Sequence, residues 1–275
     1  MLKRLLATAT VLAAVTAGVT ACSDDPDTSP GGADGRTAGS ADDGETTGDS
    51  SGPSGEDVRA FFEALASSDV TQMEDVRSLA APGSVAALYL EHQTALSVAL
   101  RDGGSEAYDP ERLTKKGDGF ESCSTADKKD EKKSCSTYGD IQSDGDKISS
   151  FTVNGKDLRN RLLAGGKKRF KAGDLAEIRL VTAYQSVNGD LYVALDLRNT
   201  TSGAAVAVES RTAYRTPEGR QVQLAGQSGP TSVQADSMAH IALAFAAAEV
   251  GGELNLQLFV ESGGSQSAEV RIPLK

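Results

Sequence analysis

The side chains best suited to chemistry in this sequence are few: three cysteines and two histidines in 275 residues. His92 lies on a predicted helix in line with Val85 and Leu88, and Tyr89 precedes it by three residues, so this face is predicted to point inward. A histidine and a tyrosine in a pocket could bind or protonate a small ligand. A hydrogen-bonded core histidine explains the same spacing. Tyr89 and His92 are therefore candidate ligand-binding residues against the alternative of a structural role.

The other residues give no catalytic pattern. His240 alternates with Ile241 on a predicted strand, which favours a surface or sheet-edge position. No Gly-x-Ser-x-Gly elbow stands between a predicted strand and a predicted helix, and the scattered acids and histidines match no regular metal-ligand spacing. We therefore expect no catalytic residues, no metal site and no cofactor, and we do not expect an enzyme.

Two cysteines lie close together, Cys123 and Cys135, with Lys128 to Lys133 as a charged run between them. No further Cys or His lies nearby, so a zinc site is disfavoured. In an exported protein such a pair usually forms a disulfide. The sequence predicts a hairpin with an exposed charged tip, closed by a bond between these cysteines.

The N-terminus has the features of an export signal. Lys3 and Arg4 precede a short apolar run, Leu5 to Val19, and this run is shorter than the ~20 residues of a membrane-spanning helix. The run ends in Val19-Thr20-Ala21-Cys22, just before a stretch of acids.

This tetrapeptide resembles the lipobox of bacterial lipoproteins, although the family usually has Leu where this sequence has Val19. The resemblance implies a lipoprotein signal peptide over residues 1–21 that is cut before Cys22, and a diacylglyceryl group on the Cys22 thiol. The protein would then be lipid-anchored in the cell membrane, on its extracytoplasmic face. The alternative is an ordinary signal peptide followed by a chance cysteine.

The segment that follows, residues 22–55, predicts a disordered acidic tether. From residue 23 onward it contains eight acids, one arginine and no large apolar side chain, so it has nothing to bury. The whole chain has a formal net charge of −11. A surface of that sign repels phosphate backbones, so we expect no nucleic acid partner.

Two types of periodicity follow the tether. Three amphipathic helices are predicted between residues 54 and 104, and short strand-like runs continue to about residue 166. From about residue 168 apolar residues alternate with polar ones, as in Leu191, Val193, Leu195 and Leu197. About seven strands at this spacing predict a two-sheet sandwich.

The element order of residues 56–166, a "FFEALAS" helix, two further helices and then strands, is similar to the nuclear transport factor 2-like fold. Residues 167–275, with "LVTAYQSVNGDLYVALDLRNTTSG" and "MAHIALAF", resemble immunoglobulin-like domains of exported bacterial proteins. The expected fold class is therefore α+β: a small nuclear transport factor 2-like domain, then an all-β immunoglobulin-like sandwich.

These features predict an anchored binding or interaction module that contacts an envelope protein or a cell-wall component. The alternative is a solute-binding protein with a small-ligand pocket in the α+β domain, lined by Tyr89 and His92.

Overall fold

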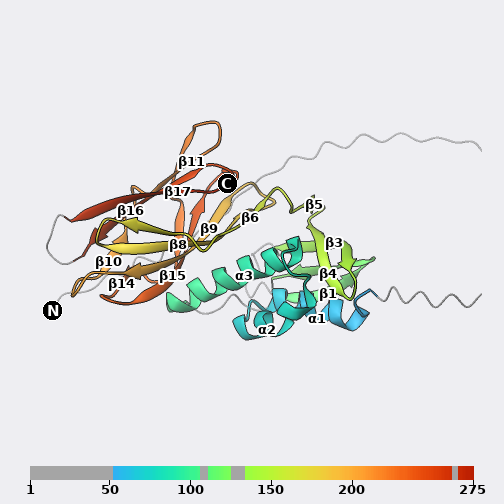
Figure 1. Ribbon diagram of the computed structural model, residues 1–275. Helices are drawn as coiled ribbons and strands as arrows, with labels where there is room; N and C mark the ends of the chain where they lie inside the picture. The colour runs from blue at the N-terminus through green and yellow to red at the C-terminus, as the bar shows by residue number, and fades with distance from the viewer. Residues whose placement is uncertain (1–51, 106–110, 125–133, 262–265) are drawn as a thin grey trace, which may run out of the picture. The chain divides into compact units, whose positions relative to one another are not determined.

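Three α-helices and one short 3₁₀ turn come first in the described residues, and each α-helix begins at a side chain that accepts a main-chain N–H. Ser54 caps α1 (Gly55–Ser67), Asp69 caps α2 (Val70–Asp75) and Ser84 caps α3 (Val85–Asp102), while η1 (Val76–Leu79) follows α2 directly. This computed structural model describes residues 52–105, 111–124, 134–261 and 266–275 (Figure 1). The predicted signal peptide, Cys22 and all but the last four residues of the predicted tether lie outside these ranges.

A five-stranded antiparallel sheet follows the helices, with its strands in sequence order. Its strands are β1 (Arg112–Lys116), β2 (Gly119–Cys123), β3 (Cys135–Asp144), β4 (Lys147–Val153) and β5 (Lys156–Asp157). The aromatic rings of α1 pack on this sheet: Phe62 contacts the rings of Phe120, Tyr138 and Phe151 at centroid distances of 4.9–5.3 Å. Burial of these rings fixes α1 across one face of the sheet.

Two six-stranded antiparallel sheets make up the rest of the described chain. One has the order β13-β15-β9-β8-β6, with β7 also paired to β8, and the other has the order β12-β11-β16-β10-β14, with β17 also paired to β16. The first contains β6 (Leu162–Ala164), β7 (Arg169–Ala172), β8 (Ala176–Gln185), β9 (Leu191–Asn199), β13 (Gly226–Ser228) and β15 (Met238–Phe245). The second contains β10 (Val206–Val208), β11 (Ala213–Arg215), β12 (Gln221–Gln223), β14 (Ser232–Val233), β16 (Glu253–Val260) and β17 (Ser267–Pro273).

The two sheets bury one shared apolar core between them. The alternating residues of β9 (Leu191, Val193, Leu195) and those of β16 (Leu254, Leu256, Leu258) belong to the same buried cluster. Two antiparallel sheets around one core form a β-sandwich, which is compatible with an immunoglobulin-like fold.

The predicted fold class, α+β with a nuclear transport factor 2-like domain, is wrong. Strands dominate the described residues, which contain three α-helices against seventeen strands. The helices also do not close a core of their own, because Tyr184 of the sandwich strand β8 lies in the same buried cluster as Phe61 and Phe62 of α1. Residues Gly48–Lys275 group as one compact unit.

The packing of α3 explains why the helices do not form a core of their own. It contacts β4 of the five-stranded sheet as well as β8, β9 and β15 of the sandwich (Figure 1). Small residues on several of its sides, Ala86, Ala95 and Ala99, are buried, so strands can approach it closely from more than one direction. None of the helices in the described residues is long and apolar enough to cross a bilayer.

Candidate binding site

The two residues predicted to line a pocket, Tyr89 and His92, lie in the core. Both rings contact the ring of Tyr184 on β8, with centroids 5.5 Å and 5.3 Å away, so the structure does bring them together. Neither side chain lines the groove between α1 and the first three strands, nor any of three further surface hollows. Burial also raises the pKa of Tyr89 well above its ordinary value.

His92 is fully buried and joins α3 to the sandwich. Its Nδ1 lies 2.8 Å from the hydroxyl oxygen of Thr182 on β8, and its Nε2 has no hydrogen-bond partner in the part of the chain that the structure describes. Desolvation lowers the pKa of His92 to about 3, so the ring is neutral near pH 7. A neutral ring that is fully buried in the core fits the structural role considered above.

The predicted disulfide between Cys123 and Cys135 is confirmed. The two residues face each other across β2 and β3, with Cα atoms 4.1 Å apart. Glu121 lies near both sulfur atoms, close enough for a three-ligand metal group. The sulfur atoms are bonded to each other, so they offer no thiolates to a metal. The charged run Lys128 to Lys133 lies outside the described residues.

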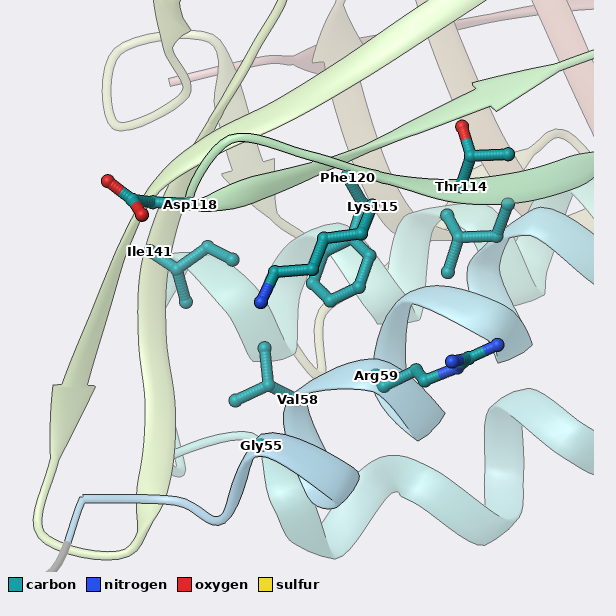
Figure 2. Close-up of a pocket in the computed structure, with 9 residues that line it drawn as sticks. Gly55, Val58, Arg59, Thr114, Lys115, Asp118, Phe120 and Ile141 are labelled. Carbon is teal, nitrogen blue, oxygen red and sulfur yellow. The ribbon is translucent and has the colours of Figure 1, made fainter.

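A groove lies between α1 and the first three strands (Figure 2). Its volume is about 610 Å³. The apolar side chains that line it are Val58, Leu113, Phe120 and Ile141, and the polar ones are Arg59, Thr114, Lys115 and Asp118, with Gly55 at one end. Apolar walls with a few polar groups are typical of ligand sites.

The strand residues reach the groove through pairing and a bulge. Lys115 on β1 pairs directly with Phe120 on β2, so both side chains lie on the same face of the sheet. On β3, Tyr138 is buried and Ile141 packs against the same core, although the two lie three positions apart. A regular strand would send them to opposite faces, but an irregularity between Gly139 and Gln142 shifts the register.

The charged side chains at the groove differ in whether they have an ion-pair partner. Lys115 has no ion-pair or hydrogen-bond partner among the described residues. Its neighbour Lys116 points to the opposite face and pairs with Glu121. The Arg59 guanidinium lies 2.7 Å from Glu63, four residues along α1, in a mostly exposed pair. Within the described part of the chain, the Lys115 ammonium group therefore has no charged partner and lies beside the apolar side chains of the groove.

A second polar cluster surrounds His240, which is about one third exposed on β15. Its Nδ1 lies 2.8 Å from Oδ2 of Asp102, the last residue of α3, and its Nε2 lies 3.5 Å from Oδ1 of Asp196 on β9. Arg179 on β8 pairs with the other oxygen of Asp196. These contacts link three strands and a helix end, and they contain no nucleophile.

Sequence reasoning missed the groove. Its lining comes from a helix and three strands, and no local motif marks such a combination. One signal was available: alternation in "RLTKK" places Lys115 on the same face as the apolar Leu113. A lysine that shares a face with an apolar side chain, and that has no ion-pair partner among the described residues, indicates a site open to an anion.

Comparisons with known proteins assign no family. No protein-family model matches the chain, and neither does any curated protein. Among solved structures, the crystal structure titled yeast GGA1_GAE domain-P21 is similar at 15% sequence identity. The match covers 39% of this chain and 100% of that chain, with a TM-score of 0.26. A TM-score this low supports no inference about this chain.

Proposed function

We propose that this protein is a lipid-anchored, extracytoplasmic binding module that contacts another component of the cell envelope. Cys22 carries the lipid anchor, and the acidic segment after it spaces the folded part from the membrane. The disulfide between Cys123 and Cys135 supports export, because such bonds persist in oxidising compartments and are rare in the cytosol.

The groove between α1 and β1 is the observation that carries the binding role. It combines apolar walls with Lys115, which has no partner among the residues that the structure describes and lies at the surface, where a ligand can reach it. The alternative of a solute pocket at Tyr89 and His92 has no such support, because both side chains are buried and no described hollow reaches them.

Anchoring is tested by metabolic labelling in the native host. The wild-type protein should incorporate labelled palmitate and sediment with the membranes, and the Cys22→Ser variant should do neither. A wild-type protein that remains unlabelled would show that the lipid anchor is wrong.

The binding role is tested in the same cells with a photoreactive benzoylphenylalanine at Arg59, beside the groove. The matched control carries it at Arg211, an exposed arginine of the sandwich that also pairs with a neighbouring glutamate. We expect a discrete cross-linked product from position 59 and none from position 211. Equal products from both positions, or none from either, would contradict a binding role for the groove.

A further inference from the structure

The lining and the volume of the groove determine which kind of ligand it can hold. Its walls are the side chains of Val58, Leu113, Phe120 and Ile141, and a volume near 610 Å³ lies in the range of small-molecule sites. Burying apolar surface against such walls is favourable, roughly 25 cal/mol per Å². A small, fully hydrated anion would gain nothing there, so the occupant needs an apolar body.

The charged side chains at the groove determine which polar group a ligand would carry. Figure 2 shows the Lys115 side chain extended beside the ring of Phe120 towards Val58, while the carboxylate of Asp118 points away from the groove. Lys115 has no acidic partner among the described residues, in a chain whose net charge is −11. An ammonium group left free beside an apolar floor is complementary to one negative charge on an apolar ligand.

We propose that the groove binds a single-chain anionic amphiphile, an apolar chain that ends in a carboxylate or a phosphate ester. The chain lies between α1 and β2 over Val58 and Phe120, and the anionic group lies at Lys115, with Arg59 close by. This inference rests on the proposed function and gives the chemical class of the envelope component that the module binds.

The geometry of the lining favours such a ligand over an extended peptide. Leu113, Lys115 and Phe120 line the groove with side chains of one sheet face, whereas the free edge of β1 is the edge on the side away from β2. A peptide added to a sheet relies on main-chain hydrogen bonds along an edge. A groove formed by side chains offers contact area and one charge instead.

The test uses the full chain with Cys22→Ser, which removes the acceptor thiol and leaves residues 52–275 unchanged. The fluorescent probe anilinonaphthalene sulfonate is itself an apolar anion and reports occupancy of the groove. It is displaced by dodecanoate, dodecyl phosphate or dodecanol, each below its micelle concentration. Vesicles of phosphatidylglycerol form a further arm, which distinguishes a free amphiphile from a lipid still in a bilayer.

We expect saturable displacement at one site per chain by both anions, and about tenfold weaker displacement by dodecanol, since one charge-assisted contact is lost. Lys115→Gln should weaken dodecanoate binding by about the same factor. Lys116→Gln is the matched control, because Lys116 neighbours Lys115 on β1 but faces the other side, and it should leave binding unchanged. Displacement by vesicles as well as by dodecanoate would place the ligand in the bilayer.

Two results would overturn the inference. The first is equal affinity for dodecanol and dodecanoate, which would mean that the charge is not recognised. The second is that Lys115→Gln fails to weaken dodecanoate binding more than Lys116→Gln does, which includes the case of no saturable displacement at all. Either result leaves the proposed function intact if a product still forms in cells from position 59, so the two proposals fail separately.

Discussion

The carboxylate of Asp102 accepts two contacts from one residue of a distant strand, His240. Its Oδ2 lies 3.2 Å from the main-chain nitrogen of His240 and 2.8 Å from the ring Nδ1. Because a carboxylate only accepts hydrogen bonds, Nδ1 carries a proton in this contact. An acid is unfavourable at the C-terminal end of a helix, where the helix dipole is negative. The contact with His240 offsets this unfavourable interaction with the helix dipole and joins α3 to β15.

The first prediction concerns this contact. Asp102→Ala should lower the free energy of unfolding by about 1 kcal/mol, because two hydrogen bonds are lost at a site that is only partly exposed. Urea denaturation measures the change. Glu91→Ala, an exposed acid on the same helix, is the control and should stay within about 0.5 kcal/mol. Equal effects of the two substitutions would show that the contact contributes nothing beyond a surface charge.

The second prediction concerns pH and His92. Burial lowers the pKa of His92 from 6.5 to about 3, so between these values the unfolded chain binds a proton that the folded chain does not. The stability contributed by the neutral ring is complete above pH 6.5 and is lost as the pH falls towards 3. At pH 5 the loss is about 2 kcal/mol relative to neutral pH.

Urea denaturation at pH 7.5 and pH 5 measures this loss, and His92→Gln should remove it because the amide does not titrate. Tyr89→Phe is the control: it changes a buried polar group on the same helix but should keep the pH dependence of the wild type. If His92→Gln loses as much stability on acidification as the wild type, the ring is not the group responsible.

The third prediction concerns Tyr214, whose hydroxyl connects two main-chain groups. It donates to the carbonyl oxygen of Glu249 at 2.6 Å and accepts from the N–H of Gly252 at 2.7 Å. Tyr214→Phe should cost about 1–3 kcal/mol, because both main-chain groups lose their partner. Ser150→Ala, which removes an exposed hydroxyl bonded to Gln142, should cost less than about 0.5 kcal/mol. Similar midpoints in urea for the two variants would contradict this account.

Local patterns in the sequence were sufficient to predict the sandwich and the disulfide. Alternation placed Leu191, Val193 and Leu195 inward, and all three are buried. The turn before Leu191 was also readable from "VNGD", since Gly189 has a φ of 93° between the paired strands β8 and β9. Strands of two or three residues, such as β14, are too short to show a period.

The α+β prediction was wrong for a non-local reason. The sequence of α3 shows one clear apolar stripe, but small residues such as Ala99 let strands approach its other sides as well. Which strands do so depends on packing between segments that are far apart in the chain. The groove escaped prediction for the same reason, because Val58, Lys115 and Ile141 come from three different elements.

The last prediction concerns the disulfide between Cys123 and Cys135. In a Cys22→Ser background these are the only two cysteines, so reduction affects this bond alone. The bond closes a short loop between β2 and β3, and a loop of this length implies about 3 kcal/mol of stabilisation by restriction of the unfolded chain.

The urea midpoint should fall when a reductant is added, and the two thiols should react with iodoacetamide only then. The double variant Cys123→Ser/Cys135→Ser should unfold at the lower midpoint and ignore the reductant. An oxidised protein with the same urea midpoint as the double variant would contradict the stabilising role of the bond. The packing of Phe120 and Ile141 would then be what holds β2 and β3 in place beside the groove.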